Sequence, residues 1–216
     1  MRYVNNNISS LFVESLNELN ISERQKSVLQ ASLTLFSEQG FENTSTTEIA
    51  QLAGVAVGTV YQQFNNKEGL LQAVLEPVIT EVIPKVASEF ANGIQAPQGP
   101  HFTEFLQNIM QDRMQFVIDN LPQIRILVRE TMVNQKIRNQ MKMELAKLPF
   151  AKLKELFVYY QEQGQLVDWE FSRILRAIIG AMCSYLVPLI FEPNKTIDVA
   201  KASQDAAETL IKGLKP

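Results

Sequence analysis

The sequence predicts an all-α protein, in which a head of short helices is followed by a domain of longer helices. Nine glycines and nine prolines among 216 residues are about 8% of the chain, below the usual ~12%, which disfavours turn-rich β architectures. Apolar residues recur with helical spacing, and several of these runs begin with residues that cap helices. The length allows one domain or two small ones.

Residues 1–20 are predicted to be an N-terminal extension. They are rich in Asn and carry one apolar cluster, which we expect to form a short helix docked on the body, at Leu11, Phe12, Leu16 and Leu19. The first helix of the head is predicted to begin at Ser22, because Ser22 and Gln25 have the spacing of a capping box. It should continue to Gln39, where Gly40 supplies a left-handed stop.

Three further helices are predicted in the head. Ser45 and Glu48 form a second capping box, which opens a short helix over Ile49–Ala53. Another short helix is expected over Ala56–Phe64. Asn66 then caps a fourth helix.

The chain after residue 75 differs from the head, because its apolar runs are longer and its capping signals are fewer. Pro77 and Pro84 predict a kink or a break in the fourth helix. Asn92–Pro100, rich in Pro and Gly, is predicted to be a loop. Further helices are expected over Phe102–Asn120, over Pro122–Leu148 as one helix or two, and over Pro149–Gln163, Asp168–Leu189 and Thr196–Lys212.

The stretch from Thr46 to Phe64 has the spacing of a helix-turn-helix. Ala50 is small enough for the following helix to cross close to it. Four residues later, Gly54 can adopt a turn conformation that a Cβ would penalise. An apolar seam would hold the two helices at a steep angle; it consists of Ile49, Val55 and Val60.

The second helix of this motif presents a polar outer face. On a helical wheel of ~100° per residue, Val60 points inward and Gly58 and Gln62 lie at the centre of the outer face. Thr59 and Tyr61 flank them. Gln62 can pair bidentately with adenine, Gly58 allows close approach of the backbone, and Tyr61 can reach a phosphate oxygen. This face is uncharged but rich in hydrogen-bonding groups, as expected of a helix that contacts DNA.

The charge of the chain argues against nucleic acid as a partner. The net charge is -3, and residues 1–75 hold seven acidic residues against four basic ones, which are Arg2, Arg24, Lys26 and Lys67. Lys67 would add a cation beside the free N–H groups at the start of a helix, which already favour an anion. The helix-turn-helix spacing is the more specific signal, and it outweighs the charge.

The run FENTSTTEIAQLAGVAVGTVYQQFNNKEGLL, from Phe41 to Leu71, resembles the DNA-binding head of TetR-family transcriptional regulators of the TetR/AcrR type. The shared elements are Gly-Phe, Thr-Thr, Ile-Ala, Ala-Gly-Val, Gly-Thr-Val-Tyr, Phe and Asn-Lys-Glu. The resemblance implies a DNA-binding domain over residues 21–75 and a ligand-binding and dimerisation domain over residues 76–216. It implies DNA contacts by Thr46, Thr47, Val57, Gly58, Thr59, Tyr61, Gln62 and Lys67.

The resemblance also implies a function. Such a protein would be a repressor that binds a palindromic operator in double-stranded DNA as a homodimer, and a small-molecule effector would release it. The chain departs from the family where Ala56 replaces the usual capping Ser, where Val57 and the pair Gln62-Gln63 replace frequent cations, and where Gly69 replaces an acidic residue. Because fewer cations release fewer counterions, we expect a shallow salt dependence of operator binding.

The homodimer is expected to form through the two C-terminal helices. The helix Asp168–Leu189 is apolar on every face, which predicts that it is buried all round and that Cys183 is buried with it. Its small side chains form one stripe, at Ala177, Ala181 and Ser184. The last helix presents a second stripe, at Ser203, Ala207, Leu210, Ile211 and Leu214.

A ligand cavity is expected among the remaining helices. Arg113 lies on an otherwise apolar stripe of the helix Phe102–Asn120, and a buried Arg needs a partner. That partner is an anionic ligand, Glu130 or Asp168. The residues expected to line the cavity are Met110, Arg113, Met114, Tyr160, Trp169, Met182 and Tyr185.

Other classes of function have little support in the sequence. With one Cys and one His, we expect no disulfide, metal site, cofactor or catalytic set, and therefore no enzyme. The longest apolar run, Ala177–Phe191, has 15 residues, short of the ~17 to 25 that span a bilayer, and no apolar signal run begins the chain. We expect a cytoplasmic protein without membrane contact. The alternative function is a helical adaptor whose head does not bind DNA.

Overall fold

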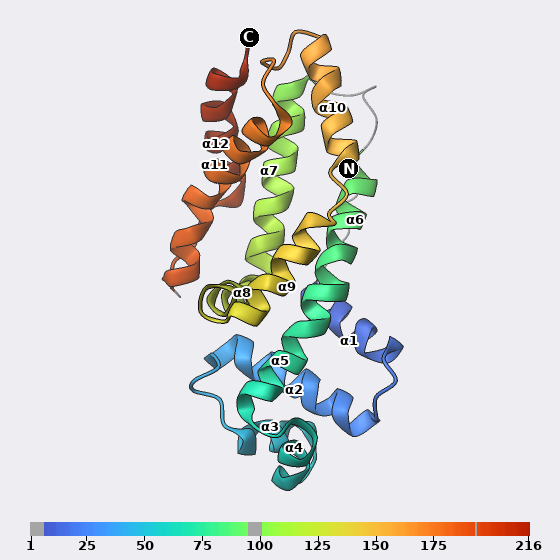
Figure 1. The fold of residues 1–216 in the computed structure, drawn as a ribbon. Helices are drawn as coiled ribbons and strands as arrows, with labels where there is room; N and C mark the ends of the chain where they lie inside the picture. Colours follow the sequence, from blue (N-terminus) through green and yellow to red (C-terminus); the bar gives the residue numbers. More distant parts are fainter. Residues whose placement is uncertain (1–6, 95–100, 193) are drawn as a thin grey trace. The chain divides into compact units, whose positions relative to one another are not determined.

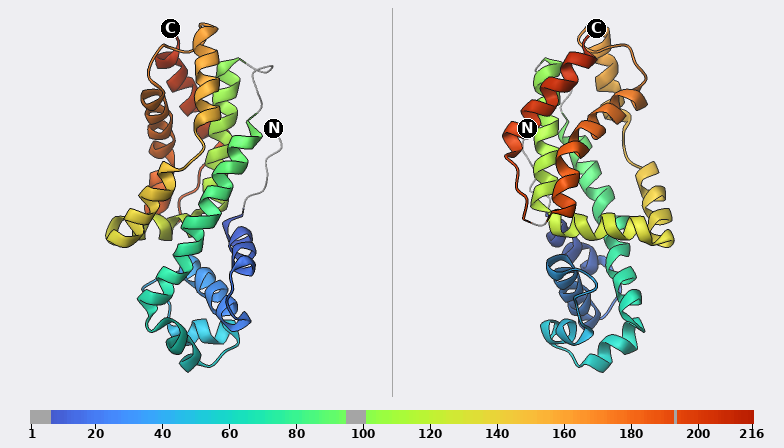
Figure 2. Two further views of the ribbon diagram at one scale, coloured as in Figure 1. Left: turned by 45° about the vertical axis from the view of Figure 1, so that its right-hand side comes forward. Right: turned by 90° about the vertical axis from the view of Figure 1, so that its left-hand side faces the viewer.

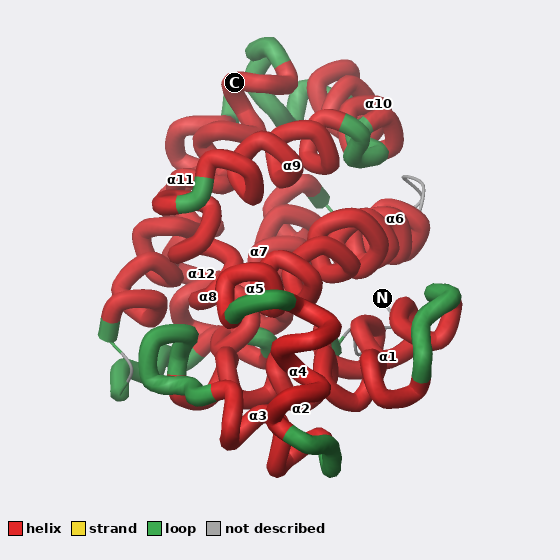
Figure 3. Tube along the Cα trace, turned by 60° about the horizontal axis from the view of Figure 1, so that its bottom comes forward, coloured by secondary structure: helices red, strands yellow, loops and turns green. Residues whose placement is uncertain are grey.

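The computed structural model describes residues 7–94, 101–192 and 194–216, and within these ranges it contains helices and no strand (Figures 1 and 3). The predicted all-α fold is confirmed. Residues 95–100 of the predicted loop lie outside the described residues. The elements are α1 (Ile8–Glu18), α2 (Glu23–Gln39), α3 (Thr46–Ala53), α4 (Val57–Phe64), α5 (Lys67–Pro77), the π-helix η1 (Val78–Val82), α6 (Ile83–Gly93), α7 (Phe102–Asp119), α8 (Leu121–Val133), α9 (Gln135–Ala146), α10 (Ala151–Glu162), α11 (Phe171–Phe191) and α12 (Val199–Leu214).

The predicted capping residues begin the helices of the head. At α2, the N–H of Gln25 donates to Ser22 Oγ at 3.3 Å, and the N–H of Ser22 donates to Gln25 Oε1 at 2.9 Å. Ser45 and Glu48 exchange the same two bonds at α3, at 3.1 and 2.8 Å, and hydrogen bonds from the Ser45 side chain and backbone lower the pKa of Glu48. Asn66 caps α5 at 2.7 Å. These bonds satisfy N–H groups that a first turn leaves free, so they determine where each helix begins.

The two prolines after the head do not break the chain into separate helices. Pro77 is the last residue of α5 and Pro84 is the second residue of α6, and the five residues of η1 lie between them. A proline removes one N–H from the helical ladder, and a π-helix is a rare element that occurs mostly as a single turn within an α-helix, as η1 does here. The chain therefore keeps a helical course from Lys67 to Gly93.

The predicted helix over Pro122–Leu148 is two helices, and Asn134 divides them. Its N–H donates to the carbonyl of Glu130 at 2.8 Å and so ends α8. Its side-chain oxygen accepts from the N–H groups of Lys136 and Ile137, at 3.0 and 3.3 Å, and so begins α9.

Helix α11 begins at Phe171, later than predicted. The amide of Gln161 donates to the carbonyls of Val167 and Trp169, at 3.0 and 2.9 Å. The N–H of Val167 donates to the carbonyl of Leu214 at 2.8 Å. Because these bonds hold the backbone of residues 167–169 in a non-helical course, the helix cannot begin at Asp168. The last helix likewise begins after Asp198, which caps it, and not at Thr196.

The described helices fall into two compact units. The first unit contains the described residues up to Ser88 together with Asn120–Leu148, and the second contains Glu89–Asp119 and Pro149–Pro216. Helices α8 and α9 belong to the first unit because α8 packs on α2, and α9 packs on α5 and η1 (Figure 2). This grouping differs from the predicted functional boundary after residue 75, which stays a prediction.

The short helix predicted in the N-terminal extension is present as α1, in the first unit. It packs against α2, α5 and η1. Ile8, Phe12 and Leu16 form its inner face and are at most 2% exposed. Its first N–H, on Ile8, donates to the Asn120 side chain at 2.7 Å, so the start of α1 is tied to the start of α8.

The second unit is built on α7, α11 and α12, which pack against one another, with α10 joined to them by aromatic rings. The rings of Phe102 on α7 and Tyr160 on α10 have centroids 5.3 Å apart. Those of Phe157 on α10 and Phe171 on α11 are 5.5 Å apart. Other fully buried side chains of this core are Leu106, Met110, Met114, Leu166 and Ile174.

Candidate nucleic-acid interface

The turn between α3 and α4 has the predicted geometry. Gly54 lies in the left-handed region, with φ 68° and ψ 33°, and its N–H donates to the carbonyls of Ala50 and Gln51. The N–H of Val55 donates to Ala50 at 3.0 Å. The side chains of Ile49 and Ala50 are buried, and Val55 is half-buried. Because a Cβ is strained at this φ, glycine suits the position that sets the direction of α4.

Helix α4 presents the predicted outer face. Val60 is 2% exposed, whereas Gly58 and Gln62 are exposed and Thr59 is half-buried. Ala56 precedes the helix without a side-chain capping bond, in line with the absence of the usual Ser. The outer face therefore carries amide, hydroxyl and bare backbone groups, which can meet base edges and phosphates.

Tyr61 connects the two helices of the motif. Its hydroxyl lies 3.0 Å from Oγ1 of Thr46, the first residue of α3, and either group can donate. The side chain of Tyr61 is nevertheless 49% exposed, so its phenol remains accessible from outside. Thr47 and Val57, also predicted to contact DNA, are exposed on the same two helices.

Lys67 is the first residue of α5, as predicted, and it has partners within the head. Its ammonium donates to three backbone carbonyls of the loop between α2 and α3, those of Phe41 at 2.9 Å, Glu42 at 3.3 Å and Thr44 at 3.1 Å. It also lies 4.4 Å from the centroid of the Phe41 ring. Because an ammonium has three N–H donors, all of them are engaged within the protein. The phosphate contact expected of Lys67 stays a prediction, and the sequence did not indicate these three bonds.

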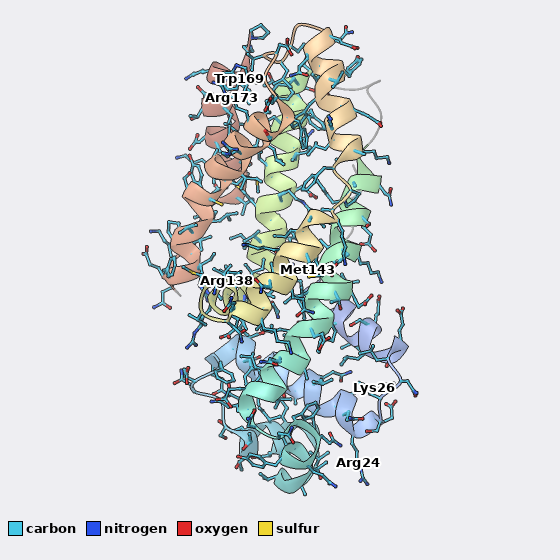
Figure 4. The ribbon with its side chains drawn as sticks, in the orientation of Figure 1. Arg24, Lys26, Arg138, Met143, Trp169 and Arg173 are labelled. Atoms are coloured by element: carbon cyan, nitrogen blue, oxygen red, sulfur yellow. The ribbon has the colours of Figure 1, made fainter. Side chains whose placement is uncertain are left out.

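Sequence reasoning did not single out Arg24 as a cation available for DNA. Among the described cations up to residue 75, Lys26 pairs with Glu23 at 2.7 Å and Lys67 is bound as above, whereas Arg24 is exposed and has neither an ion pair nor a hydrogen bond. Figure 4 shows its side chain pointing away from the ribbon at the end of the head where α4 lies. Arg24 is one of four cations in this part of the sequence, and no pattern in the sequence shows which of them lacks a partner within the protein.

In the second unit, Arg113 is half-buried and paired with its neighbour in the chain. Its Nε lies 2.6 Å from a carboxylate oxygen of Asp112, and its guanidinium lies 4.1 Å from the centroid of the Phe90 ring. The observed partner is therefore neither Glu130 nor Asp168. Adjacent residues face different sides of a helix, so helical spacing did not indicate this pair.

The other residues predicted to line a ligand cavity are unequally buried. Three belong to the packed interior, namely Met110, Met114 and Tyr160, and burial raises the pKa of the Tyr160 hydroxyl. Three are half-buried, namely Trp169, Met182 and Tyr185. Arg173 stacks on Trp169, with its guanidinium 3.4 Å from the ring centroid (Figure 4). The structure thus places Tyr160 with the ring of Phe102 and places Trp169 with Arg173.

Helix α11 is not buried all round, contrary to the prediction. Its inner side includes Ile174 and Ile178, which are buried. Its outer side exposes an apolar row at four-residue spacing, which consists of Ile179, Cys183 and Val187. The pattern of apolar residues shows which side chains avoid water, but in the described chain nothing covers this side of the helix. We refer to these three residues as the α11 face.

The same helix has the length and composition of a membrane span. It runs for 21 residues, is strongly apolar, and has only a minority of its residues buried. The apolar run Ala177–Phe191 is only the second part of this helix, which begins at Phe171. A single helix of this kind is weak evidence for a membrane protein, since core helices of soluble proteins have the same properties.

The stripe predicted on the last helix is occupied within the subunit. Ser203, Ala207 and Leu214 are at most 2% exposed, and α12 packs against α7 and α11 of the same chain. Small side chains let these helices approach closely. The other two residues of the stripe, Leu210 and Ile211, are half-buried, and the contact of this helix with a second subunit stays a prediction.

A helix-turn-helix at the end of an all-helical chain defines a class of protein, the DNA-binding regulators that place the second helix of the motif in the major groove. Residues 28–74 match the family described as bacterial regulatory proteins, tetR family. The uncharacterized HTH-type transcriptional regulator TtgW of Pseudomonas putida is 31% identical over 97 residues, which cover 39% of this chain and 72% of TtgW. The chain belongs to the tetR family of transcriptional regulators.

The similarity to curated relatives is concentrated in the head. The chain spans about a third of the length of the first relatives it matches, 34% and 37%. Solved structures resemble it over nearly all of its length. A TetR transcriptional regulator from Agrobacterium tumefaciens has a TM-score of 0.63 at 17% identity, with 90% of this chain and 96% of that chain covered. FadR of Bacillus subtilis, solved with stearoyl-CoA, has a TM-score of 0.60 at 18% identity, with 87% and 97% covered. At these identities the likeness concerns the fold.

Proposed function

We propose that the protein is a cytoplasmic repressor that binds a palindromic DNA operator as a homodimer and is released by a small-molecule ligand. The observation that carries this proposal is the outer face of α4, where Gly58 and Gln62 are exposed above the buried Val60. The amide of Gln62 would read an adenine edge in the major groove. Tyr61 and Arg24 would meet phosphates and fix the register.

A homodimer is required because two α4 helices must lie ~34 to 36 Å apart to enter successive turns of the major groove. The α11 face supports this contact. Burial of exposed apolar surface by a second copy lowers the free energy by roughly 25 cal/mol per Å². The contact would therefore centre on α11 and extend to α12, where Leu210 and Ile211 are half-buried.

The ligand part of the proposal is supported by the apolar interior of the second unit and by the FadR structure, which contains stearoyl-CoA. Met110, Met114 and Tyr160 lie in that interior. Release would be a population shift, in which the ligand favours a spacing of the two heads that no longer fits one operator. To control binding, the ligand must favour that form by ~3 to 5.5 kcal/mol.

Gel-shift and footprinting assays on the DNA upstream of the protein's own gene test the proposal, at about 50 and about 200 mM salt. We expect one retarded complex and two protected half-sites about one helical turn apart, or a multiple of that distance. Because the head offers few free cations, the slope of log affinity against log salt should be shallower than about -8. A helical adaptor, the alternative function, would shift no DNA at either salt concentration.

A further inference from the structure

We propose that Lys67 is a positioning residue of the DNA-binding head, which holds the helix-turn-helix from both of its ends and does not contact the DNA backbone. This inference rests on the proposed function, because DNA binding reads out the position of α4. The carbonyls that Lys67 binds lie 23 to 26 residues earlier in the chain, at Phe41, Glu42 and Thr44.

These carbonyls belong to the loop that leads into α3. Phe41 is 9% exposed and Thr44 is 2% exposed, so this backbone is partly shielded from water. A carbonyl that is buried without a partner costs about 1 to 3 kcal/mol, and Lys67 donates to the part-buried carbonyls of Phe41 and Thr44. The carbonyl of Phe41 also accepts from the N–H of Thr44 at 3.3 Å, and the bond from Lys67 to the carbonyl of Glu42 is exposed. The loop is further anchored because the Thr44 hydroxyl donates to the carbonyl of Gly40 at 2.8 Å, and the ring of Phe41 packs on Phe36 at 5.3 Å.

Lys67 is also attached closely to the end of α4. The connection from α4 to α5 is tight, since Asn65 has φ 62° and a Cβ on Gly69 would collide with the carbonyl of Phe64. Lys67 lies inside this turn as the first residue of α5. One side chain therefore joins the residues just before α3 to the residues just after α4, and the two helices between them are held at both ends.

In this arrangement the Lys67 ammonium holds the backbone of its own head in place. Its three donors point at carbonyls of its own head, and the Phe41 ring covers a further side of it. A phosphate contact would need at least one of these donors to leave its carbonyl. We infer that removing the Lys67 side chain misplaces α4 without removing a charge contact to DNA.

The test uses Lys67→Met in the full-length protein, which keeps an unbranched side chain only one atom shorter and removes the three donors. Operator affinity is measured at several salt concentrations, at a temperature well below the unfolding midpoint of both proteins. We expect the affinity to fall by about tenfold, equivalent to 1.4 kcal/mol, with an unchanged salt slope. The matched control is Arg24→Met, for which the slope should become shallower by about 0.9 for each phosphate that Arg24 neutralises in the wild type.

Two outcomes would overturn the proposal. A shallower salt slope for Lys67→Met would show that Lys67 contacts phosphate, and a lower unfolding midpoint with unchanged affinity would show that it serves stability alone. A second measurement needs no variant and no DNA. In the free protein labelled with ¹⁵N, the Lys67 ammonium should give a signal protected from solvent exchange. The absence of this signal would exclude the bonds from Lys67 to the three carbonyls. If the wild-type protein binds no operator, the proposed function fails, and this signal still decides whether Lys67 makes these bonds.

Discussion

The hydroxyl groups of Tyr61 and Thr46 lie 3.0 Å apart and join the middle of α4 to the first residue of α3. The apolar seam between the same two helices includes Ile49 and Val60, both of which are buried. Tyr61 thus has a bond within the protein and an exposed phenol at the same time. Its two roles can be separated by substitution.

Tyr61→Ala is expected to weaken binding to every operator sequence by the same factor, because a phosphate contact carries no sequence information. Fluorescence anisotropy with the operator and with single-base-pair variants measures this. Tyr61→Phe is the control, since it keeps the ring and removes the hydroxyl that bonds to Thr46. A loss confined to one base pair would instead assign Tyr61 to base recognition.

Gln62→Ala is expected to relax the preference at one base pair of each half-site by ~1 to 3 kcal/mol, because the exposed amide is placed to pair with an adenine edge. The affinities of a set of operators with single substitutions give this value. Gln135→Ala, which removes an exposed amide at the start of α9, should change none of them. If Gln62→Ala lowers all affinities equally, Gln62 reads no base.

Ile179→Glu is expected to yield a monomer with greatly weakened operator binding, since it puts a charge in the middle of the α11 face, where Ile179 is 49% exposed. Sedimentation equilibrium measures the mass, and anisotropy measures the binding. Thr209→Glu places the same charge at an exposed position of α12 and should leave the dimer intact. A dimer that persists in Ile179→Glu would place the subunit contact elsewhere.

Phe12→Ala is expected to lower the free energy of unfolding by about 3 to 5 kcal/mol, because Phe12 is 1% exposed and its removal leaves a cavity between α1 and its neighbours. Urea unfolding followed by circular dichroism measures the change. Val13→Ala is the control on the same helix; Val13 is 39% exposed, and its removal should cost less than about 0.5 kcal/mol. Equal effects of the two changes would mean that α1 is not docked in solution.

Glu130→Gln is expected to stabilise the protein increasingly as the pH rises from about 4 to 7. Glu130 is 6% exposed, and its burial raises the pKa of its carboxyl above the ordinary 4.5, an effect that Arg129 partly offsets. A raised pKa in the folded state means that the folded state holds the proton more tightly. Its contribution to stability is therefore complete below the unfolded pKa and is lost as the pH rises through the folded pKa.

Urea unfolding at several pH values measures this difference between Glu130→Gln and the wild type. Glu144→Gln is the control, because Glu144 is also buried but pairs with Lys147 at 2.7 Å. Its substitution breaks that ion pair and should give no gain at neutral pH. A constant difference between Glu130→Gln and wild type across the range would show that Glu130 keeps an ordinary pKa.

The features that could be predicted from the sequence are those made by residues close together in the chain. The capping boxes at Ser22 and Ser45, the cap at Asn66 and the left-handed turn at Gly54 are all present as predicted. Each depends on groups within about four residues, so the local order of side chains is sufficient. The helix-turn-helix and its exposed face follow from the same local rules, which is why the family could be recognised from this part of the chain.

The tertiary structure alone decided which groups meet across longer distances. The donors of Lys67 bind carbonyls 23 to 26 residues away. Helix α12 packs against α7, whereas the α11 face is exposed. In the sequence all three stretches have ordinary helical patterns. Periodicity shows that a side chain leaves water or carries a charge. It does not show which surface covers that side chain, because the packing of every other helix determines its partner.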